Sequence, residues 1–159
     1  MGKVIIQSEY TTQNPITMIG KEAGICWGAD ITDDNKNYKR GLECLENEHG
    51  RTFEFPDIYT VLDGYSARVI REWYTHIGGA PTRLQASTRY IDYEHGFGYV
   101  TPPSIAGNSE ASEVYDDLMH YISTSLQKLD ELKIPREDSA LGLPVGMETK
   151  MVDKRNLRN

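Results

Sequence analysis

Residues 66–93 read SARVIREWYTHIGGAPTRLQASTRYIDY, and this stretch decides the fold that we expect. Apolar side chains recur at helical spacing from Val69 to Ile77, so the first part predicts a helix. The glycines and the proline within residues 78–81 predict that a loop follows. The run Arg89–Tyr93 favours β-structure, so we expect the stretch to end in a strand.

The second half of this stretch carries side chains that suit the binding of an anion. Arg83 lies in the predicted loop, and Ser87, Thr88 and Arg89 lie where the loop becomes the strand. Hydroxyl and backbone N–H groups donate hydrogen bonds, and an arginine offers two parallel donors to a phosphate. The same residues also fit an ordinary corner with a surface arginine, and on their own they leave both interpretations open.

The composition suits a single domain over residues 1–159, because a hydrophobic fraction of 38% is enough for a modest core. With 17 basic and 24 acidic residues the net charge is -7. This argues against non-specific nucleic-acid binding but allows a local basic pocket for a small phosphate. No apolar run approaches the roughly 20 residues that cross a bilayer, and no signal-peptide pattern precedes Lys3. We expect a soluble, cytoplasmic protein without a membrane or nucleic-acid partner.

Cys26 and Cys44 are the two cysteines of the chain. They form no C-x-x-C pair and have no histidine at ligand spacing, so we expect no metal site and no disulfide framework. We expect both thiols to be reduced and surrounded by apolar side chains.

The rest of the chain alternates predicted helices and strands, which indicates an α+β fold with a mostly antiparallel sheet flanked by helices. The longest predicted helix starts at Asn108 or Ser109 and runs for about 24 residues. One stripe of it is apolar and is either core or a subunit contact. The other predicted strands are Lys3–Tyr10, Pro56–Asp63, which Gly64 ends, and Met147–Val152. Asn14 is the predicted cap of one helix, either Asp33 or Asp34 that of the next, and Ser66 that of the helix in residues 66–77. A further short helix is predicted to start at Ile134-Pro135.

His76 at the end of the predicted helix and Ser87-Thr88-Arg89-Tyr90 after the loop form one pattern. It resembles the signature of the flavin-dependent thymidylate synthases, in which a helix ends in Arg-His-Arg and a short loop leads to Ser-x-Arg-Tyr. Thr75 and Ile77 stand in place of the two flanking arginines, and the loop is one residue longer.

The resemblance implies the reductive methylation of dUMP to dTMP. The methylene group would come from methylenetetrahydrofolate and the hydride from reduced FAD, which NADPH reduces. It implies Arg89 and Ser87 as catalytic residues. Glu72 stands where the family has a glutamine that faces the nucleotide, and a solvated surface acid is the alternative there. The dUMP-binding residues implied in this way are Glu72, Arg83, Gln85, Ser87, Thr88 and Arg89.

The end of the chain also resembles the family, through Leu143-Pro144-Val145-Gly146 and Asn156-Leu157-Arg158. The resemblance implies that Asn156, Arg158 and His76 contact the flavin. A frayed polar end is the alternative for Asn156 and Arg158. Phe55, after Glu54, replaces a histidine that contacts the flavin in the family.

Two further departures concern the substrate site. Ala140, four residues before Pro144, stands where the family has an arginine that binds the nucleotide phosphate. The family also continues with further helical turns beyond the position of Asn159, so we expect a truncated chain, a gene remnant or a chain completed by a second fragment. Because the family's active sites form where several subunits of a homotetramer meet, we expect self-association.

Three hypotheses therefore compete. The first is an active flavin-dependent thymidylate synthase, and the second is a catalytically impaired homologue that binds nucleotide or flavin without turnover. The third is an assembly domain whose long acidic helix contacts a partner protein.

Overall fold

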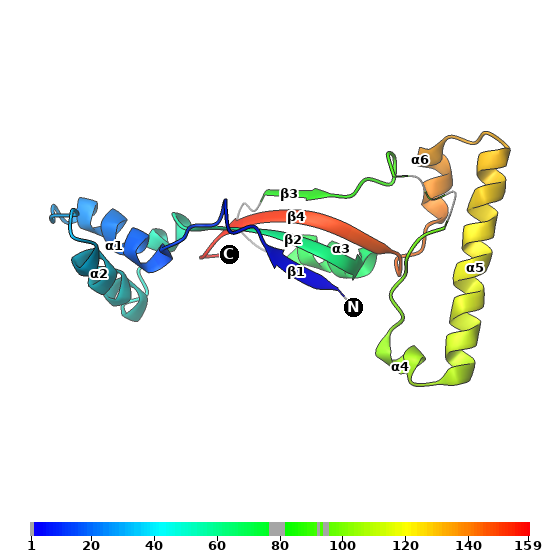
Figure 1. The fold of residues 1–159 in the computed structure, drawn as a ribbon, viewed down its shortest axis with the longest axis horizontal. Helices are drawn as coiled ribbons and strands as arrows, with labels where there is room; N and C mark the ends of the chain where they lie inside the picture. Colours follow the sequence, from blue (N-terminus) through cyan, green and yellow to red (C-terminus); the bar gives the residue numbers. More distant parts are fainter. Residues whose placement is uncertain (1, 77–81, 92, 94–95) are drawn as a thin grey trace. The chain divides into compact units, whose positions relative to one another are not determined.

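The computed structural model describes residues 2–76, 82–91, 93 and 96–159 (Figure 1). Its centre is an antiparallel sheet of four strands in the order β1-β2-β4-β3. This confirms the predicted α+β fold. The two long strands lie side by side in the middle and the two short ones form the edges. The strands are β1 (Lys3–Ile6), β2 (Asp57–Ser66), β3 (Thr82–Gln85) and β4 (Glu148–Asn156).

The contacts divide the chain into two compact units. The first unit consists mainly of Leu62–His76 and Leu84–Met151, and the second mainly of Ile5–Val61 and Val152–Asn159. The expectation of a single domain over residues 1–159 stays a prediction.

The core of the first unit forms where helix α3 (Ala67–His76) packs on the sheet. Ile70 is fully buried against Leu62 of β2 and Met151 of β4, and Trp73 packs against this cluster. Ser66 accepts a hydrogen bond from the backbone N–H of Val69 at 3.3 Å, as its predicted capping role requires.

The long helix of the first unit is α5 (Ser109–Glu131), close to its predicted length. Asn108 caps it by accepting a hydrogen bond from the N–H of Ala111 at 3.1 Å. The short elements around it are α4 (Pro103–Ala106), α6 (Arg136–Ser139) and the 3₁₀ turn η2 (Ala140–Gly142).

The second unit is built on the helix pair α1 (Pro15–Cys26) and α2 (Asp34–Glu46), followed by the 3₁₀ turn η1 (Gly50–Glu54). The two helices touch at their backbones, because a Cβ at Gly20 would lie only 1.8 Å from the carbonyl oxygen of Asn37. A Cβ at Gly41 would likewise lie 2.0 Å from the carbonyl oxygen of Ile16. Only glycine allows this approach.

Several sequence predictions about these elements are wrong. Asp33 caps α2 through the N–H groups of Asn35 and Lys36, but the side chain of Asn14 makes no capping hydrogen bond. Cys26 is exposed at the end of α1, whereas Cys44 is buried between the helices as predicted. The strand predicted over Lys3–Tyr10 ends at Ile6, since residues 8–10 form a turn.

Two strand boundaries also differ. β2 continues through Gly64 to Ser66, because Gly64 takes a φ of 71° without leaving the strand. β4 reaches Asn156, four residues beyond the predicted end, so that Asn156 is the last residue of a strand.

The strand predicted over Arg89–Tyr93 is not formed by its described residues. The strand lies earlier, at β3, and Ser87 begins a turn instead. The backbone hydrogen bonds explain the difference. The N–H of Ala86 still donates to the carbonyl of Lys150 on β4 at 2.8 Å, whereas the N–H groups of Tyr90 and Ile91 donate to the carbonyl of Ser87 and close a turn. Ile77 and the predicted loop over residues 78–81 lie outside the described residues.

In the described part of the chain, no helix is both long enough and apolar enough to cross a membrane.

Candidate functional site

The candidate site begins at the turn that follows β3. The carbonyl of Ser87 accepts hydrogen bonds from the N–H groups of Tyr90 and Ile91, at 3.2 and 3.1 Å. The hydroxyl of Ser87 accepts a further one from the N–H of Arg89 at 3.2 Å. A serine at the first position of a turn stabilises it in this way. Thr88 and Arg89 are thereby placed at the tip of the turn.

Arg89 reaches from this turn to α6. Its Nε donates to Oε2 of Glu137 at 3.1 Å, and both side chains are well exposed. An exposed ion pair of this kind adds little net stability, because water already solvates both charges. Another anion can therefore replace Glu137 as the partner of Arg89 at a small cost in free energy.

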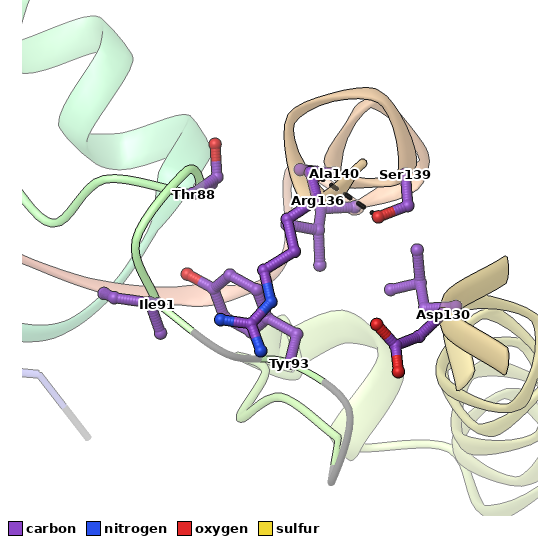
Figure 2. Close-up of a pocket in the computed structure, with 9 residues that line it drawn as sticks. Thr88, Ile91, Tyr93, Asp130, Arg136, Ser139 and Ala140 are labelled. Atoms are coloured by element: carbon purple, nitrogen blue, oxygen red, sulfur yellow. Dashed lines mark hydrogen bonds between the residues drawn. The ribbon is translucent and has the colours of Figure 1, made fainter. Parts of the chain in front are cut away.

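A small hollow lies beside the turn and is lined in part by residues of α5 and α6. Figure 2 shows Arg136 extending from α6 toward Ile91 and Tyr93. Burial raises the pKa of Tyr93, so its phenol stays protonated at neutral pH and can donate a hydrogen bond. The residues around the hollow are Thr88, Ile91, Tyr93, Leu126, Asp130, Arg136, Ser139, Ala140 and Leu143.

Gln85 lies at the end of β3, just before the turn. Its amide nitrogen is 3.5 Å from the hydroxyl of Thr149 on β4, a long hydrogen bond. Thr149 also borders a shallower hollow on this side of the sheet, which shares Ile91 and Tyr93 with the first one. Ala86, between Gln85 and the turn of residues 87–91 (the Ser87 turn), also lines this second hollow.

Glu72 and His76 pair with each other on α3. The His76 Nε2 atom lies 2.9 Å from Oε2 of Glu72, one helical turn earlier, and both side chains are exposed. The sequence assigned Glu72 to the substrate and His76 to the flavin, and the structure brings these two side chains together.

Arg83 belongs to the second unit, and its side chain is only 9% exposed. Its Nε lies 3.7 Å from Oδ1 of Asp153 on β4, an ion-pair distance that is too long for a hydrogen bond. Asp153 is 1% exposed and also accepts a hydrogen bond from Nε of Arg155 at 2.7 Å. Arg83 is therefore part of a buried charge cluster in the sheet.

Arg158 pairs with η1 and Asn156 ends β4, so neither belongs to a frayed end. The guanidinium of Arg158 pairs with Glu54, which also accepts a hydrogen bond from Arg51 at 2.9 Å. The side chain of Asn156 accepts a hydrogen bond from the N–H of Arg158 at 3.1 Å. Hydrogen bonding from Arg158, more than from Arg51, lowers the pKa of Glu54.

Sequence reasoning missed Arg136, Glu137 and Tyr93 as site residues. Arg136 and Glu137 follow Ile134-Pro135, and charged residues in the first turn of a helix are explained locally by capping and the helix dipole. Tyr93 looked like an ordinary strand aromatic. The available signal was the i, i+4 spacing of Arg136 and Ala140, which puts an arginine one helical turn from the position where the resemblance expects one.

The fold and this site define a class of protein, an α+β chain with a Ser-Thr-Arg turn beside a small hollow. The family model for thymidylate synthase complementing proteins matches residues 8–159. The chain therefore belongs to this family, which confirms the resemblance found in its sequence.

Among solved structures, the chain is similar to a UMP/dUMP methylase, PolB from Streptomyces cacaoi, bound with 5-Br dUMP. The TM-score is 0.75 at 16% sequence identity, over 98% of this chain and 73% of that chain. At this identity the likeness supports the fold alone. No curated protein matches the sequence.

Proposed function

We propose that this chain is a flavin-dependent thymidylate synthase that converts dUMP to dTMP by reductive methylation. Family membership supports the reaction class, and the similar fold is that of a UMP/dUMP methylase bound with 5-Br dUMP, which agrees with this choice of nucleotide. The observation that carries the proposal is the Ser87 turn, which places Thr88 at the hollow and lets the exposed Arg89 reach the carboxylate of Glu137.

In this proposal the turn binds the nucleotide. Arg89 exchanges Glu137 for the phosphate, because a guanidinium can bind two phosphate oxygens at once. The hydroxyls of Ser87 and Thr88 supply shorter-range donors, and the apolar wall of the hollow packs on the pyrimidine ring. Gln85 and Glu72 are proposed as further substrate contacts, and the assignment of Arg83 to the substrate stays a prediction from the resemblance.

The residues proposed for FAD suit that cofactor by their chemistry. His76, Asn156 and Arg158 offer an imidazole, an amide and a guanidinium, which are exposed or half-buried and can donate hydrogen bonds to a diphosphate or to ring carbonyls. Bound FAD, once reduced by NADPH, supplies the hydride, and methylenetetrahydrofolate supplies the carbon. The protein's part is to bind, orient and polarise the reactants.

The proposed chemistry needs no protein thiolate, and the state of Cys44 agrees with this. Cys44 lies in the core between α1 and α2, where burial raises the pKa of its thiol and keeps it protonated. In this proposal the turn that carries Ser87 and Arg89 binds and polarises the nucleotide instead.

Self-association as a homotetramer is part of the proposal. The outward stripe of α5 leaves Val114, Leu118 and Tyr121 exposed by 68, 50 and 72%. Apolar side chains repeated on one helix face are typical of a subunit contact. Light scattering after gel filtration tests this, and a monomer at micromolar concentration contradicts it.

The function is tested by supplying the purified protein with FAD, NADPH, methylenetetrahydrofolate and [5-²H]dUMP. The proposal predicts a flavin spectrum that stays with the protein, loss of deuterium from the uracil 5-position, and dTMP. Binding of dUMP or flavin with no deuterium loss and no dTMP would instead support a catalytically impaired homologue. The pairing of Arg89 with Glu137 favours that second candidate. Absence of both binding and turnover contradicts both.

A further inference from the structure

The outward face of α5 has the spacing of a seam along which two helices can pair. Met119 and Leu126 lie on the opposite face and are buried. On the outward face, side chains recur alternately four and three residues apart, which is the spacing of a two-stranded coiled coil. The first three of them are exposed apolar side chains, and the last is the single lysine of α5. The seam consists of Val114, Leu118, Tyr121, Ser125 and Lys128.

The two halves of this seam differ in charge. Exposed carboxylates lie along the first half, whereas the second half has Lys128, the only lysine or arginine of α5. Asp130 also belongs to the second half, but it lines the hollow beside the Ser87 turn. The seam is therefore acidic at its start and basic at its end. The exposed carboxylates of the first half are those of Glu110, Glu113 and Asp117.

This difference in charge determines how a second α5 would pack on the seam. Two helices that run in the same direction would bring carboxylate to carboxylate and Lys128 to Lys128, and like charges repel. In opposite directions with Tyr121 at the centre, Lys128 faces Val114, since each is seven residues from Tyr121. The ammonium group of Lys128 then comes beside Glu113 at the flank of the seam, where charged pairs set the direction of helix pairing. The charges therefore favour antiparallel pairing.

The surface beside the seam has room for the side chains of such a partner. One hollow lies between α4 and the first half of α5, and Val114 and Leu118 belong to its lining. Another lies beside the second half, and Tyr121 and Lys128 belong to its lining. In an antiparallel pair, the first hollow of each copy faces the second hollow of the other, because a two-fold axis makes both contacts at once. A second copy of this chain therefore fits the surface.

We propose that two copies of this chain pair through antiparallel α5 helices, with Tyr121 at the two-fold axis and Lys128 of each copy beside Glu113 of the other. This inference rests on the self-association that is part of the proposed function, and it names one contact of that assembly. The pairing uses no residue of the Ser87 turn, so it can be tested apart from nucleotide binding.

The test is a charge reversal and its rescue, measured by sedimentation velocity of the full chain at low salt, where exposed charges are screened least. Lys128→Glu and Glu113→Lys should each weaken self-association about 10- to 50-fold, because symmetry repeats the new repulsion at both ends of the pair. The double variant Lys128→Glu/Glu113→Lys has opposite charges at these positions again. It should therefore associate within about threefold of the wild-type protein.

Arg68→Glu is the matched control, since Arg68 is exposed on α3 of the same unit and its reversal changes the net charge equally. It should leave self-association unchanged, and thermal unfolding should show that every variant is folded. A double variant that associates no better than the single variants, or unchanged association in Lys128→Glu, overturns the pairing.

Formation of dTMP by the wild-type protein, measured on the same samples, separates this result from the proposed reaction. An active protein whose association does not depend on Lys128 overturns the pairing and leaves the reaction standing. Rescue by the double variant without any dTMP supports the pairing and contradicts the reaction alone. A wild-type protein that stays monomeric contradicts both the pairing and the proposed self-association.

Discussion

Arg89 of the Ser87 turn donates its Nε–H to the Glu137 carboxylate of α6 across 3.1 Å. The proposed substrate carries a phosphate that would bind the same guanidinium. Glu137 therefore competes with the nucleotide for Arg89, and the two anions cannot both pair with it in the same way.

Removing this competitor should tighten nucleotide binding. Glu137→Gln takes away the negative charge but keeps the shape of the side chain. Exposed ion pairs are worth about 0.2–1 kcal/mol, so we expect dUMP to bind about two- to fivefold more tightly by calorimetry. Glu131→Gln, at the exposed end of α5, is the control and should have no effect. Weaker binding in Glu137→Gln would mean that the carboxylate supports the nucleotide instead of competing with it.

The buried charge cluster of the sheet should be the most sensitive to substitution. Asp153→Asn removes the carboxylate that Arg83 and Arg155 share, and leaves two largely buried guanidiniums without it. We expect a loss of about 3 kcal/mol in the free energy of unfolding, measured with urea. The control is Asp63→Asn, which breaks a more exposed pair with Lys150 at 3.0 Å and should cost less than about 1 kcal/mol. Equal losses of unfolding free energy in the two variants would contradict the claim that burial makes the Asp153 cluster more sensitive.

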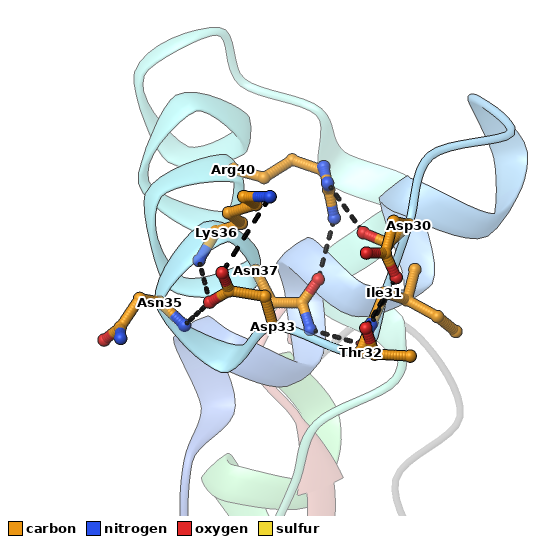
Figure 3. A network of polar contacts seen from close by, with 8 residues as sticks. All are labelled: Asp30, Ile31, Thr32, Asp33, Asn35, Lys36, Asn37 and Arg40. Carbon is orange, nitrogen blue, oxygen red and sulfur yellow. Dashed lines mark hydrogen bonds and ion pairs between the residues drawn. The ribbon is translucent and has the colours of Figure 1, made fainter.

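The helix pair of the second unit is fixed by a buried amide (Figure 3). Asn37 is fully buried, donates to the carbonyl of Ile31 at 2.9 Å and accepts from Arg40 at 2.8 Å. Asn37→Ala leaves both groups without this partner and should destabilise the protein by about 2 kcal/mol in thermal or urea unfolding. Asn35→Ala, the same change at an exposed position of α2, should stay within about 0.5 kcal/mol. The two variants should therefore unfold at clearly different urea concentrations.

The contact between Arg158 and η1 should depend on acid pH. The pKa of Glu54 is held below its ordinary value of 4.5, first by the hydrogen bond from Arg158. A depressed pKa in the folded state gives stability that is present above the unfolded pKa and is lost as pH falls through the folded value. An NMR titration should place the Glu54 carboxyl below 4.5 in the wild type and closer to 4.5 in Arg158→Ala. Identical titrations would show that Arg158 does not pair with Glu54 in solution.

The sequence was sufficient where local signals and long-range packing agree. The helix caps at Asp33, Ser66 and Asn108 were predictable, because a side-chain oxygen before an amphipathic run has a local function. The extent of α5 followed from its apolar stripe.

Prediction from the sequence failed where strand pairing or contacts between distant residues determine the structure. Arg89 has neighbours that favour a strand, yet the register of β3 against β4 ends at Ala86 and turns the chain there. Glu137 and Arg136 have an adequate local explanation as first-turn residues, so nothing in the pattern links them to Arg89, 48 residues away. The Ser-Thr-Arg run was predicted from the family motif, whereas the acidic partner of Arg89 could be identified only from the structure.

The central claim is that the Ser87 turn binds dUMP through Arg89, and calorimetry on Arg89→Ala tests it most directly. The account predicts that dUMP binds the wild-type protein and that the variant binds it about 10- to 150-fold more weakly, equivalent to roughly 1.5–3 kcal/mol. An unchanged affinity for dUMP in Arg89→Ala would remove the arginine from the site and contradict the account.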